Sequence, residues 1–306
     1  MSAIATVIVP GTTANLGSGF DCIGAALTLY NQFRFTAATD TAVPLKISVQ
    51  GEEAKGLQAD KSNLVYRAFC KLYDRIGQPA PPVEIEIKLG VPLSRGLGSS
   101  ATAIIGGLVG ANRLAGNALS VAEIMEIAIA MEGHPDNVVP TLLGNCQLSV
   151  KTLDKWEVCA VPWHQAIVPI VAIPDFELST EAARAVLPTS VSRADAIFNI
   201  SRMGMLVRGL GEHHPDWLRA ALDDALHQPY RQSLIRGYEE VQAAAIAAGA
   251  YGMAISGAGP ALLALADSAK AKTVAEAMQT AWEREGVRAE ALLLALDAEG
   301  ARIIDN

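Results

Sequence analysis

Apolar and polar residues alternate from Val83 to Leu89, which is the pattern of a strand with one buried face. Shorter apolar runs predict further strands at residues 5–9, 31–36, 45–49, 146–150, 157–161, 167–173, 252–255, 261–266 and 289–296. Longer segments of helix-forming residues predict helices at residues 63–76, 101–115, 121–131, 179–187, 193–210, 217–225, 234–248 and 269–285. This mixture of elements predicts an α+β protein.

Local signals define the ends of two of these helices. Ser62 or Asn63 is a suitable N-cap for the first helix, and Gly77 is a suitable stop. Ser120 and Glu123 have the spacing of a capping box, so the third helix begins directly after the serine.

The order of elements after residue 252 is strand, turn, strand, helix, strand. This order predicts a small antiparallel sheet with helices on one face. We place a domain division near residue 160, although no linker marks it. The N-terminal domain would span residues 1–160 and the C-terminal domain residues 161–306.

A glycine-rich segment from Pro92 to Thr102 joins the alternating strand to the second helix. Gly96 and Gly98 precede two hydroxyls, Ser99 and Ser100. A strand-to-helix junction exposes unpaired N–H groups at the positive end of the helix dipole, and glycines let an anion approach them. We therefore expect a phosphate site here. It is neither a P-loop, since no lysine follows the glycines, nor a Gly-x-Gly-x-x-Gly fingerprint.

Three further segments crowd small or polar residues together. Residues 11–21 are too rich in glycine and small polar residues for a core element, and Asn15 and Asp21 are their strongest polar groups. Residues 132–137 place Glu, His, Asp and Asn in one turn, where capping a helix that starts near Val138 explains only the aspartate. Residues 256–260 are expected to form a glycine turn between two short strands. Because glycines have no side chain, a phosphate or another loop can approach the backbone of this turn closely.

The composition restricts the class of protein. The chain has 306 residues, is 51% hydrophobic and carries a net charge of −8, which argues against nucleic acid as a partner. The N-terminus has no signal-peptide pattern, and the apolar runs are too short to cross a membrane. The four cysteines lack paired spacing, so we expect reduced, mostly buried thiols and a cytoplasmic protein.

The three motifs together resemble the GHMP kinase superfamily over nearly the whole chain. They are the polar glycine loop at 10–24, the Gly-Leu-Gly-Ser-Ser loop at 96–100 and the Gly-x-Gly-Pro turn at 257–260. The first motif, residues 132–138 and residues 179–188 are most similar to the homoserine kinase branch. The resemblance implies an N-terminal ribosomal-protein-S5-domain-2-like domain and a C-terminal ferredoxin-like α/β sandwich.

The resemblance also implies a site for ATP and Mg²⁺. The residues that would hold the nucleotide are Pro92, Leu93, Ser94, Arg95, Gly96, Leu97, Gly98, Ser99, Ser100, Ala101, Thr102, Gly257 and Gly259. Magnesium would be held by a loop hydroxyl, Ser99 or Ser100, and by a glutamate. Glu132 is the first choice for that glutamate and Glu126 the second.

The substrate implied by the resemblance is L-homoserine. The residues that match its binding site are Asn15, Asp21, His134, Asn137, Thr180, Arg184 and Arg231. Two arginines suit a carboxylate, because a guanidinium binds it through two parallel hydrogen bonds. Asp21, with Ser99, Ser100 and Glu132, is a candidate catalytic residue, and whether Asp21 acts as a base or only positions the substrate stays open.

The expected reaction transfers the γ-phosphoryl group of ATP to the side-chain hydroxyl of L-homoserine. The product is O-phospho-L-homoserine, a step of threonine biosynthesis, and the enzyme is expected to be a homodimer. One alternative is another GHMP kinase acting on mevalonate or a diphosphocytidyl sugar alcohol. Another is a non-catalytic binding protein on the same scaffold.

Overall fold

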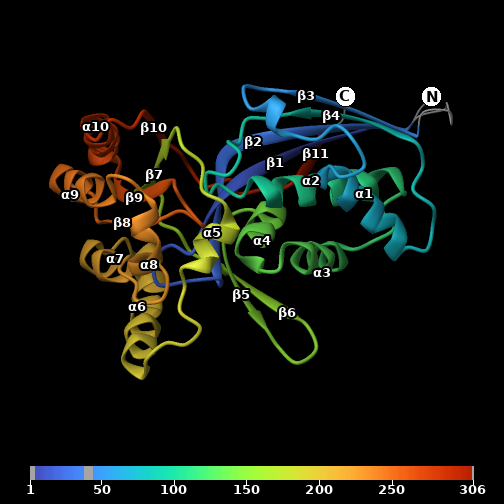
Figure 1. Ribbon diagram of the computed structural model, residues 1–306. Helices are drawn as coiled ribbons and strands as arrows, with labels where there is room; N and C mark the ends of the chain where they lie inside the picture. The colour runs from blue at the N-terminus through green and yellow to red at the C-terminus, as the bar shows by residue number, and fades with distance from the viewer. Residues whose placement is uncertain (1–3, 38–43, 305–306) are drawn as a thin grey trace.

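The structure, a computed structural model, describes residues 4–37 and 44–304 (Figure 1). Its strands are β1 (Ile4–Ala14), β2 (Ile23–Ala37), β3 (Leu45–Gln50), β4 (Val83–Lys88), β5 (Cys146–Lys151), β6 (Trp156–Val161), β7 (Ile167–Pro174), β8 (Gly252–Ile255), β9 (Leu262–Asp267), β10 (Ala289–Leu293) and β11 (Arg302–Ile304). Its α-helices are α1 (Leu64–Arg75), α2 (Ser99–Leu114), α3 (Val121–Glu132), α4 (Pro135–Leu143), α5 (Thr180–Ala185), α6 (Arg193–Glu212), α7 (Pro215–Ala221), α8 (Gln228–Arg231), α9 (Tyr238–Ala248) and α10 (Ser268–Arg284).

Each predicted helix and strand has a counterpart, and the predicted caps are confirmed. Asn63 accepts a hydrogen bond from the N–H of Val65 at the start of α1, and Ser120 and Glu123 form the capping box of α3. The pattern did not predict α8 or β11, because four and three residues are too few to show a periodicity.

The prediction of a loop for residues 11–21 was wrong in its first part. Strand β1 continues to Ala14, because Thr12 and Thr13 pair with Ala26 and Ala25 of β2 beyond a bulge. Both threonines are buried, and their hydroxyls find partners in the fold, so small polar residues serve as strand residues here.

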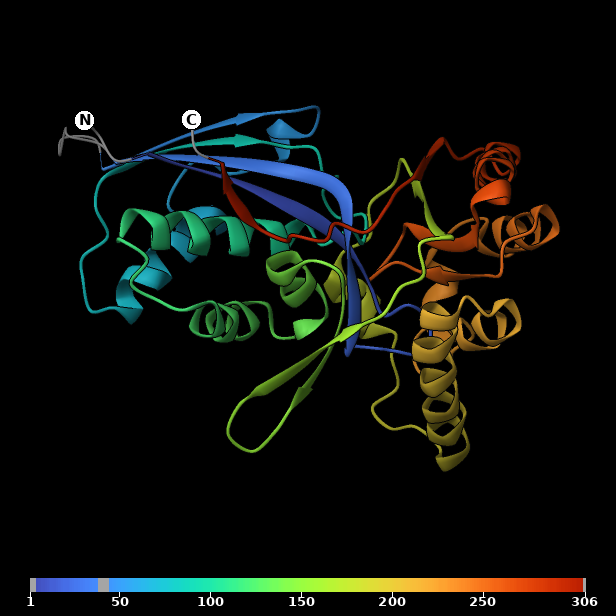
Figure 2. The same ribbon diagram turned by 180° about the vertical axis from the view of Figure 1, so that it is seen from behind.

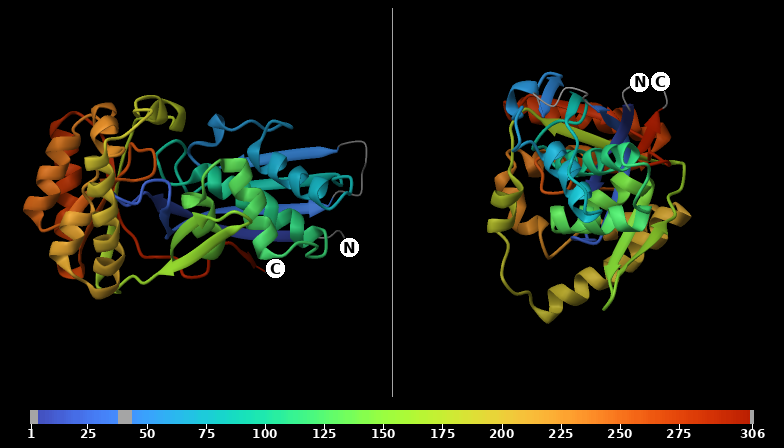
Figure 3. Two further views of the ribbon diagram at one scale, coloured as in Figure 1. Left: turned by 90° about the horizontal axis from the view of Figure 1, so that it is seen from below. Right: turned by 90° about the vertical axis from the view of Figure 1, so that its right-hand side faces the viewer.

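Two sheets organise the described residues. The first has the order β11-β1-β2-β4-β3, and β5 with β6 extends from β2. The second has the antiparallel order β10-β7-β9-β8. The bodies built on the two sheets lie side by side along the length of the molecule (Figure 3).

Helices α1 to α4 lie on one face of the first sheet (Figures 1 and 2). Every second residue of its central strands enters the core beneath them, as Phe33, Phe35, Ile85 and Ile87 do. The side chain of Phe35 is fully buried and stacks on Phe69 of α1.

The second sheet carries helices on both faces, whereas the sequence predicted one. Ile170 and Ala172 of β7 pack in a core with α9 and α10. Val171 and Ile173 point the other way, into a core with α6 and α7. The strand is apolar on both sides, so either face excludes water only when it is covered.

The chain returns to the first sheet at its end, where β11 pairs antiparallel with β1 (Figure 2). Asp297 holds this return, since it accepts hydrogen bonds from Tyr30, Arg302 and the N–H of Gly300. The domain division at residue 160 stays a prediction.

The four cysteines are free, but the expectation of mostly buried thiols was wrong. Cys146 is buried and Cys70 half-buried, whereas Cys22 and Cys159 are exposed. Burial raises the pKa of the Cys146 thiol. Among the described residues, no helix has the length and apolarity needed to cross a membrane.

We predict that Gly110→Ala in α2 destabilises the fold. An added Cβ would lie 2.2 Å from a ring carbon of the buried Phe35, which cannot move aside. Overpacking costs about 1–3 kcal/mol, which exceeds the roughly 1 kcal/mol that alanine gains in helix propensity. Urea unfolding measures the change in unfolding free energy.

Gly204→Ala in α6 is the matched control, because no described atom outside the local backbone lies within 4 Å of its added Cβ. This substitution should raise the unfolding free energy by up to about 1 kcal/mol. Equal stability changes in the two variants would contradict the packing argument.

Candidate active site

The loop between β4 and α2 depends on its two glycines. Gly96 and Gly98 have φ values of 76° and 67°, in the left-handed region. A Cβ at Gly96 would lie 2.2 Å from the carbonyl oxygen of Ser256, and one at Gly98 would lie 2.1 Å from Oγ1 of Thr12. Other residues are excluded by both backbone conformation and space, and the N-terminus of α2 is left facing the site.

Three segments that the sequence singled out separately are joined by backbone hydrogen bonds. The N–H of Thr12 donates to Leu97, and the N–H of Ala261 donates to Arg95, at 3.0 and 3.1 Å. The N–H of Gly257 donates to Ala14 at 3.1 Å. The end of β1, the glycine loop and the 256–260 turn therefore form one rigid unit.

A cavity of about 350 Å³ lies against this unit. It is lined by most of the predicted site residues: Asn15, Asp21, Leu93, Ser94, Arg95, Gly96, Gly98, Ser99, Ser100, Glu132, His134, Asn137, Thr180, Arg184, Arg231, Gly257 and Gly259. Pro92, Leu97, Ala101, Thr102 and the second-choice Glu126 are not among the lining residues. Leu97, Ala101 and Thr102 are buried behind the loop, which they support.

A hydroxyl and a carboxylate meet at the start of α2. Ser100 donates from Oγ to Oε1 of Glu132, the last residue of α3, at 2.6 Å. Glu126 lies earlier on α3 and is exposed. Oxygen donors of this kind suit magnesium, so the fold favours Glu132 of the two glutamates.

The turn after α3 holds a tight histidine–aspartate pair. Nδ1 of His134 lies 2.5 Å from Oδ1 of Asp136, which is buried. Burial alone would lower the pKa of His134, but Asp136 and the charge of Glu132 raise it above its ordinary value. Asn137 accepts a hydrogen bond from Thr12 at 2.7 Å, so this turn is tied to β1.

Asp21 and Arg184 form a bidentate ion pair across the cavity. Nη2 and Nη1 of Arg184 donate to the two carboxylate oxygens at 2.8 and 3.1 Å. Asn15 is buried and supports the loop, since its Nδ2 donates to Gly257 at 2.7 Å and its Oδ1 accepts from the N–H of Asp21. One ring nitrogen of His134, an oxygen of Asp136 and an oxygen of Asp21 lie within 4.8 Å of one another.

Arg231 is buried and held from two sides. Its Nε donates to the carbonyl of Ala183 at 3.0 Å, and its Nη1 donates to the carbonyl of Gly257 at 3.1 Å. Burial, followed by the nearby charge of Arg184, lowers the pKa of Arg231. Both arginines line the cavity, as does Thr180 of α5.

Arg95 does not present its guanidinium as a free anion ligand. Nε donates to Pro174 at the end of β7, Nη1 to Leu93, and Nη2 to Asp175, at 3.0–3.3 Å. Glu53 and Glu177 lie within 3.7 Å. This side chain connects the glycine loop to the second sheet.

Sequence reasoning missed part of the lining. Asn31 of β2 is buried, accepts from the N–H groups of Gly90 and Val91 and donates to Thr102, so it anchors both ends of the loop. The apolar wall of the cavity also escaped prediction: Phe33, Leu57, Leu64, Val65, Ile87 and Leu89. In the sequence these strand and helix residues are recognisable only as apolar positions. Such a position can lie in a cavity wall or in the core, and the pattern does not distinguish the two.

Comparison with known proteins agrees with this arrangement. The profile of the GHMP kinases N terminal domain matches residues 63–145, and that of the GHMP kinases C terminal domain matches residues 204–284. The fold and the glycine loop thus define a GHMP kinase.

Individual relatives show which branch of the GHMP kinases the chain resembles. A homoserine kinase from Trichormus variabilis is 64% identical over 97% of both chains, and one from Crocosphaera subtropica is 62% identical over 97% of both chains. The solved homoserine kinase from Cytophaga hutchinsonii superposes with a TM-score of 0.89 at 27% identity, covering 98% of this chain and 97% of that one. The chain belongs to the homoserine kinase family of the GHMP kinases.

We predict that Arg95→Lys weakens the fold more than it weakens nucleotide binding. An ammonium cannot serve three carbonyls in the plane of a guanidinium, so about 1–3 kcal/mol of unfolding free energy should be lost. Thermal unfolding and the KM for ATP are measured together.

The control is Arg208→Lys, because Arg208 forms an exposed ion pair with Glu212 on α6. This substitution should change the unfolding free energy by less than about 0.5 kcal/mol. A large rise in the KM for ATP with unchanged stability would instead assign Arg95 to the nucleotide.

Proposed function

We propose that the protein transfers the γ-phosphoryl group of ATP to the side-chain hydroxyl of L-homoserine and forms O-phospho-L-homoserine. The observation that carries this proposal is the lining of one cavity, which combines the glycine loop and the N-terminus of α2 with two arginines, Arg184 and Arg231. A phosphate donor fits the loop, and an acceptor with a carboxylate fits the arginines.

The nucleotide end would use the loop at 93–100. N–H groups at the start of α2 would donate to the phosphates, and the left-handed glycines would let the phosphates approach closely. The turn at Gly257 and Gly259 closes the other side of the loop. The apolar wall formed by β2, β4 and α1 gives a base a dry surface.

Magnesium is the metal that would accompany the nucleotide, with Ser100 and Glu132 as the protein groups that hold it and Ser99 beside them. Their 2.6 Å contact brings two oxygen donors to the phosphate end, which is a fitting donor set for this ion. When bound, the ion supplies positive charge that offsets the charge of the transferred group.

The acceptor end suits an amino acid. Arg231 and Arg184 would bind the carboxylate, and Asp21, His134 and Asn137 supply polar groups for the rest of the molecule. A sugar alcohol has no carboxylate for these arginines to bind, whereas mevalonate has one as homoserine does, so only an assay separates the last two.

The chain's own contribution to the reaction is chiefly to orient the groups. Phosphoryl transfer has a loose transition state, so holding the hydroxyl in line and neutralising charge account for most of the rate. Asp21 is oriented by Arg184, as expected for a residue that positions the substrate and its partner arginine.

The test of the function is release of ADP in the presence of homoserine, mevalonate or shikimate. We expect turnover with homoserine alone. Activity with another acceptor and not with homoserine would show that homoserine is not the substrate. Failure to bind ATP with magnesium would favour the non-catalytic alternative.

We also predict that Asp21→Asn retains turnover. The pair with Arg184 is about one-third exposed, and such pairs contribute at most about 1 kcal/mol, so the KM for homoserine should rise by no more than about fivefold. The exposed pair Asp216 with Arg219 supplies the control, Asp216→Asn, which should leave both constants unchanged. A collapse of kcat at unchanged KM for homoserine would make Asp21 a base.

A further inference from the structure

The loop after β1 adopts a backbone that needs outside support. Asn15, Leu16 and Asp21 all have positive φ values, at 72°, 48° and 55°. Residues other than glycine are strained in this region and stay there only when their surroundings hold them. Since Asp21 and Asn15 face the acceptor end, whatever holds this loop also shapes the site.

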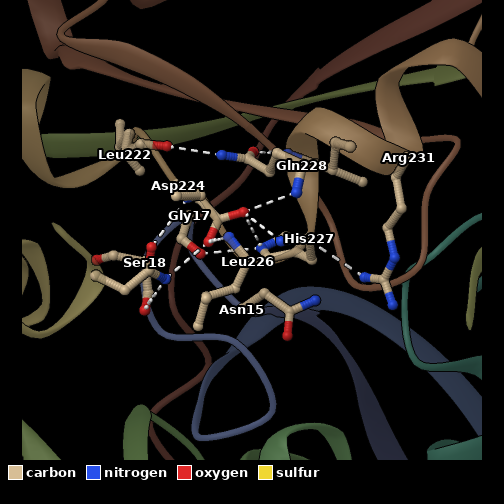
Figure 4. Close-up of polar contacts among 12 residues, drawn as sticks. Asn15, Gly17, Ser18, Leu222, Asp224, Leu226, His227, Gln228 and Arg231 are labelled. Atoms are coloured by element: carbon tan, nitrogen blue, oxygen red, sulfur yellow. Dashed lines mark hydrogen bonds and ion pairs between the residues drawn. The ribbon is translucent and has the colours of Figure 1, made fainter. Parts of the chain in front are cut away.

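The support comes from the segment between α7 and α8 (Figure 4). Asp224 is buried and accepts hydrogen bonds from the N–H groups of Leu226, His227 and Gln228 at 2.7–2.9 Å. It also accepts from Nδ2 of Asn199 on α6 at 2.7 Å, and its Oδ2 lies 3.6 Å from Nε2 of His227. A carboxylate held by four donors fixes this turn in one conformation.

Two side chains then reach from this turn and from α6 to the loop. Nδ2 of Asn199 donates to the carbonyl of Ser18 at 3.2 Å. Nε2 of His227, whose side chain is fully buried, lies 3.0 Å from the carbonyl oxygen of Gly17. Neither residue lines the cavity.

The neighbours of His227 define its protonation. A carbonyl oxygen only accepts, so Nε2 carries the proton. Nδ1 lies 3.4 Å from Nη1 of Arg231, which only donates, so Nδ1 presents a lone pair. The ring is therefore neutral, and burial lowers the pKa of His227 although Asp224 and Asp21 oppose that change.

The ring of His227 also forms one side of a stack. Phe20 lies parallel to it with ring centroids 4.9 Å apart. The guanidinium carbons of Arg231 and Arg184 lie 5.1 and 6.0 Å from the centroid of Phe20. The two arginines thus share an aromatic neighbour that His227 holds in place.

We propose that His227 is a positioning residue of the acceptor site, which as the Nε2–H tautomer holds the Gly17 carbonyl and aligns Arg231 for a substrate carboxylate. This inference rests on the proposed function, because it assigns the carboxylate to Arg231. It adds a buried residue that bears on acceptor affinity without touching the acceptor.

The experiment compares two substitutions of His227 with the unmodified enzyme. His227→Phe keeps the stack on Phe20 and loses both polar contacts, whereas His227→Gln can place an N–H near the position of Nε2. We expect His227→Phe to raise the KM for homoserine about tenfold to a hundredfold and leave the KM for ATP within about twofold. His227→Gln should recover a large part of the loss. The exposed His164 supplies the control, His164→Phe.

Thermal unfolding of each variant separates positioning from stability. A lower melting temperature with both KM values unchanged, or equal rises in the two KM values, would overturn the proposal. Equal KM values for homoserine in the Phe and Gln variants would overturn the role of the Gly17 contact. The unmodified enzyme tests the proposed function separately, since its failure to phosphorylate homoserine would remove both proposals.

Discussion

The active site depends on a set of backbone hydrogen bonds that join three segments distant in sequence. The end of β1, the glycine loop before α2 and the turn at 256–260 bond directly through Leu97, Arg95 and Ala14. This close backbone contact leaves no room for a Cβ at Gly96, and the hydroxyl of Thr12 leaves none at Gly98. Hydroxyls fill the remaining gaps, since Ser256 donates to the carbonyl of Gly96 and accepts from the hydroxyl of Thr13.

The part of the cavity around Arg231 is assembled mainly by buried polar groups. Asn15 and Arg231 both donate to the carbonyl of Gly257. The loop after β1 and helix α8 are therefore tied to the same carbonyl oxygen. Buried polar groups are costly unless paired, and pairing makes their geometry rigid. The site therefore has an arginine in a fixed position before any ligand arrives, which lowers the ordering cost of binding.

The two bodies of the molecule are coupled where the site lies. Arg95 connects the glycine loop to the end of β7, and β11 returns the chain to the first sheet. A displacement of one body relative to the other would break contacts that shape both ends of the cavity. This arrangement suits phosphoryl transfer, in which donor and acceptor must be held in line.

The sequence by itself determined most of the helices and strands, the glycines of the loop before α2 and the class of kinase. Local patterns are enough to predict these features. Apolar alternation, helix caps and glycine positions depend on the conformation of the backbone immediately around them. The resemblance also supplied the residues that meet in the cavity, including Arg184 and Arg231.

Only the tertiary structure decided which contacts each residue makes. Arg95 belongs to a carbonyl cluster, Thr12 and Thr13 to a buried strand, and His227 to the support of a loop 210 residues earlier. These roles arise from contacts with residues that are far apart in sequence. The identity of an amino acid does not show which distant residue it will contact in the fold. The sequence of β7 is apolar on both sides, but only the tertiary structure shows that α9 and α10 cover one side and α6 and α7 the other.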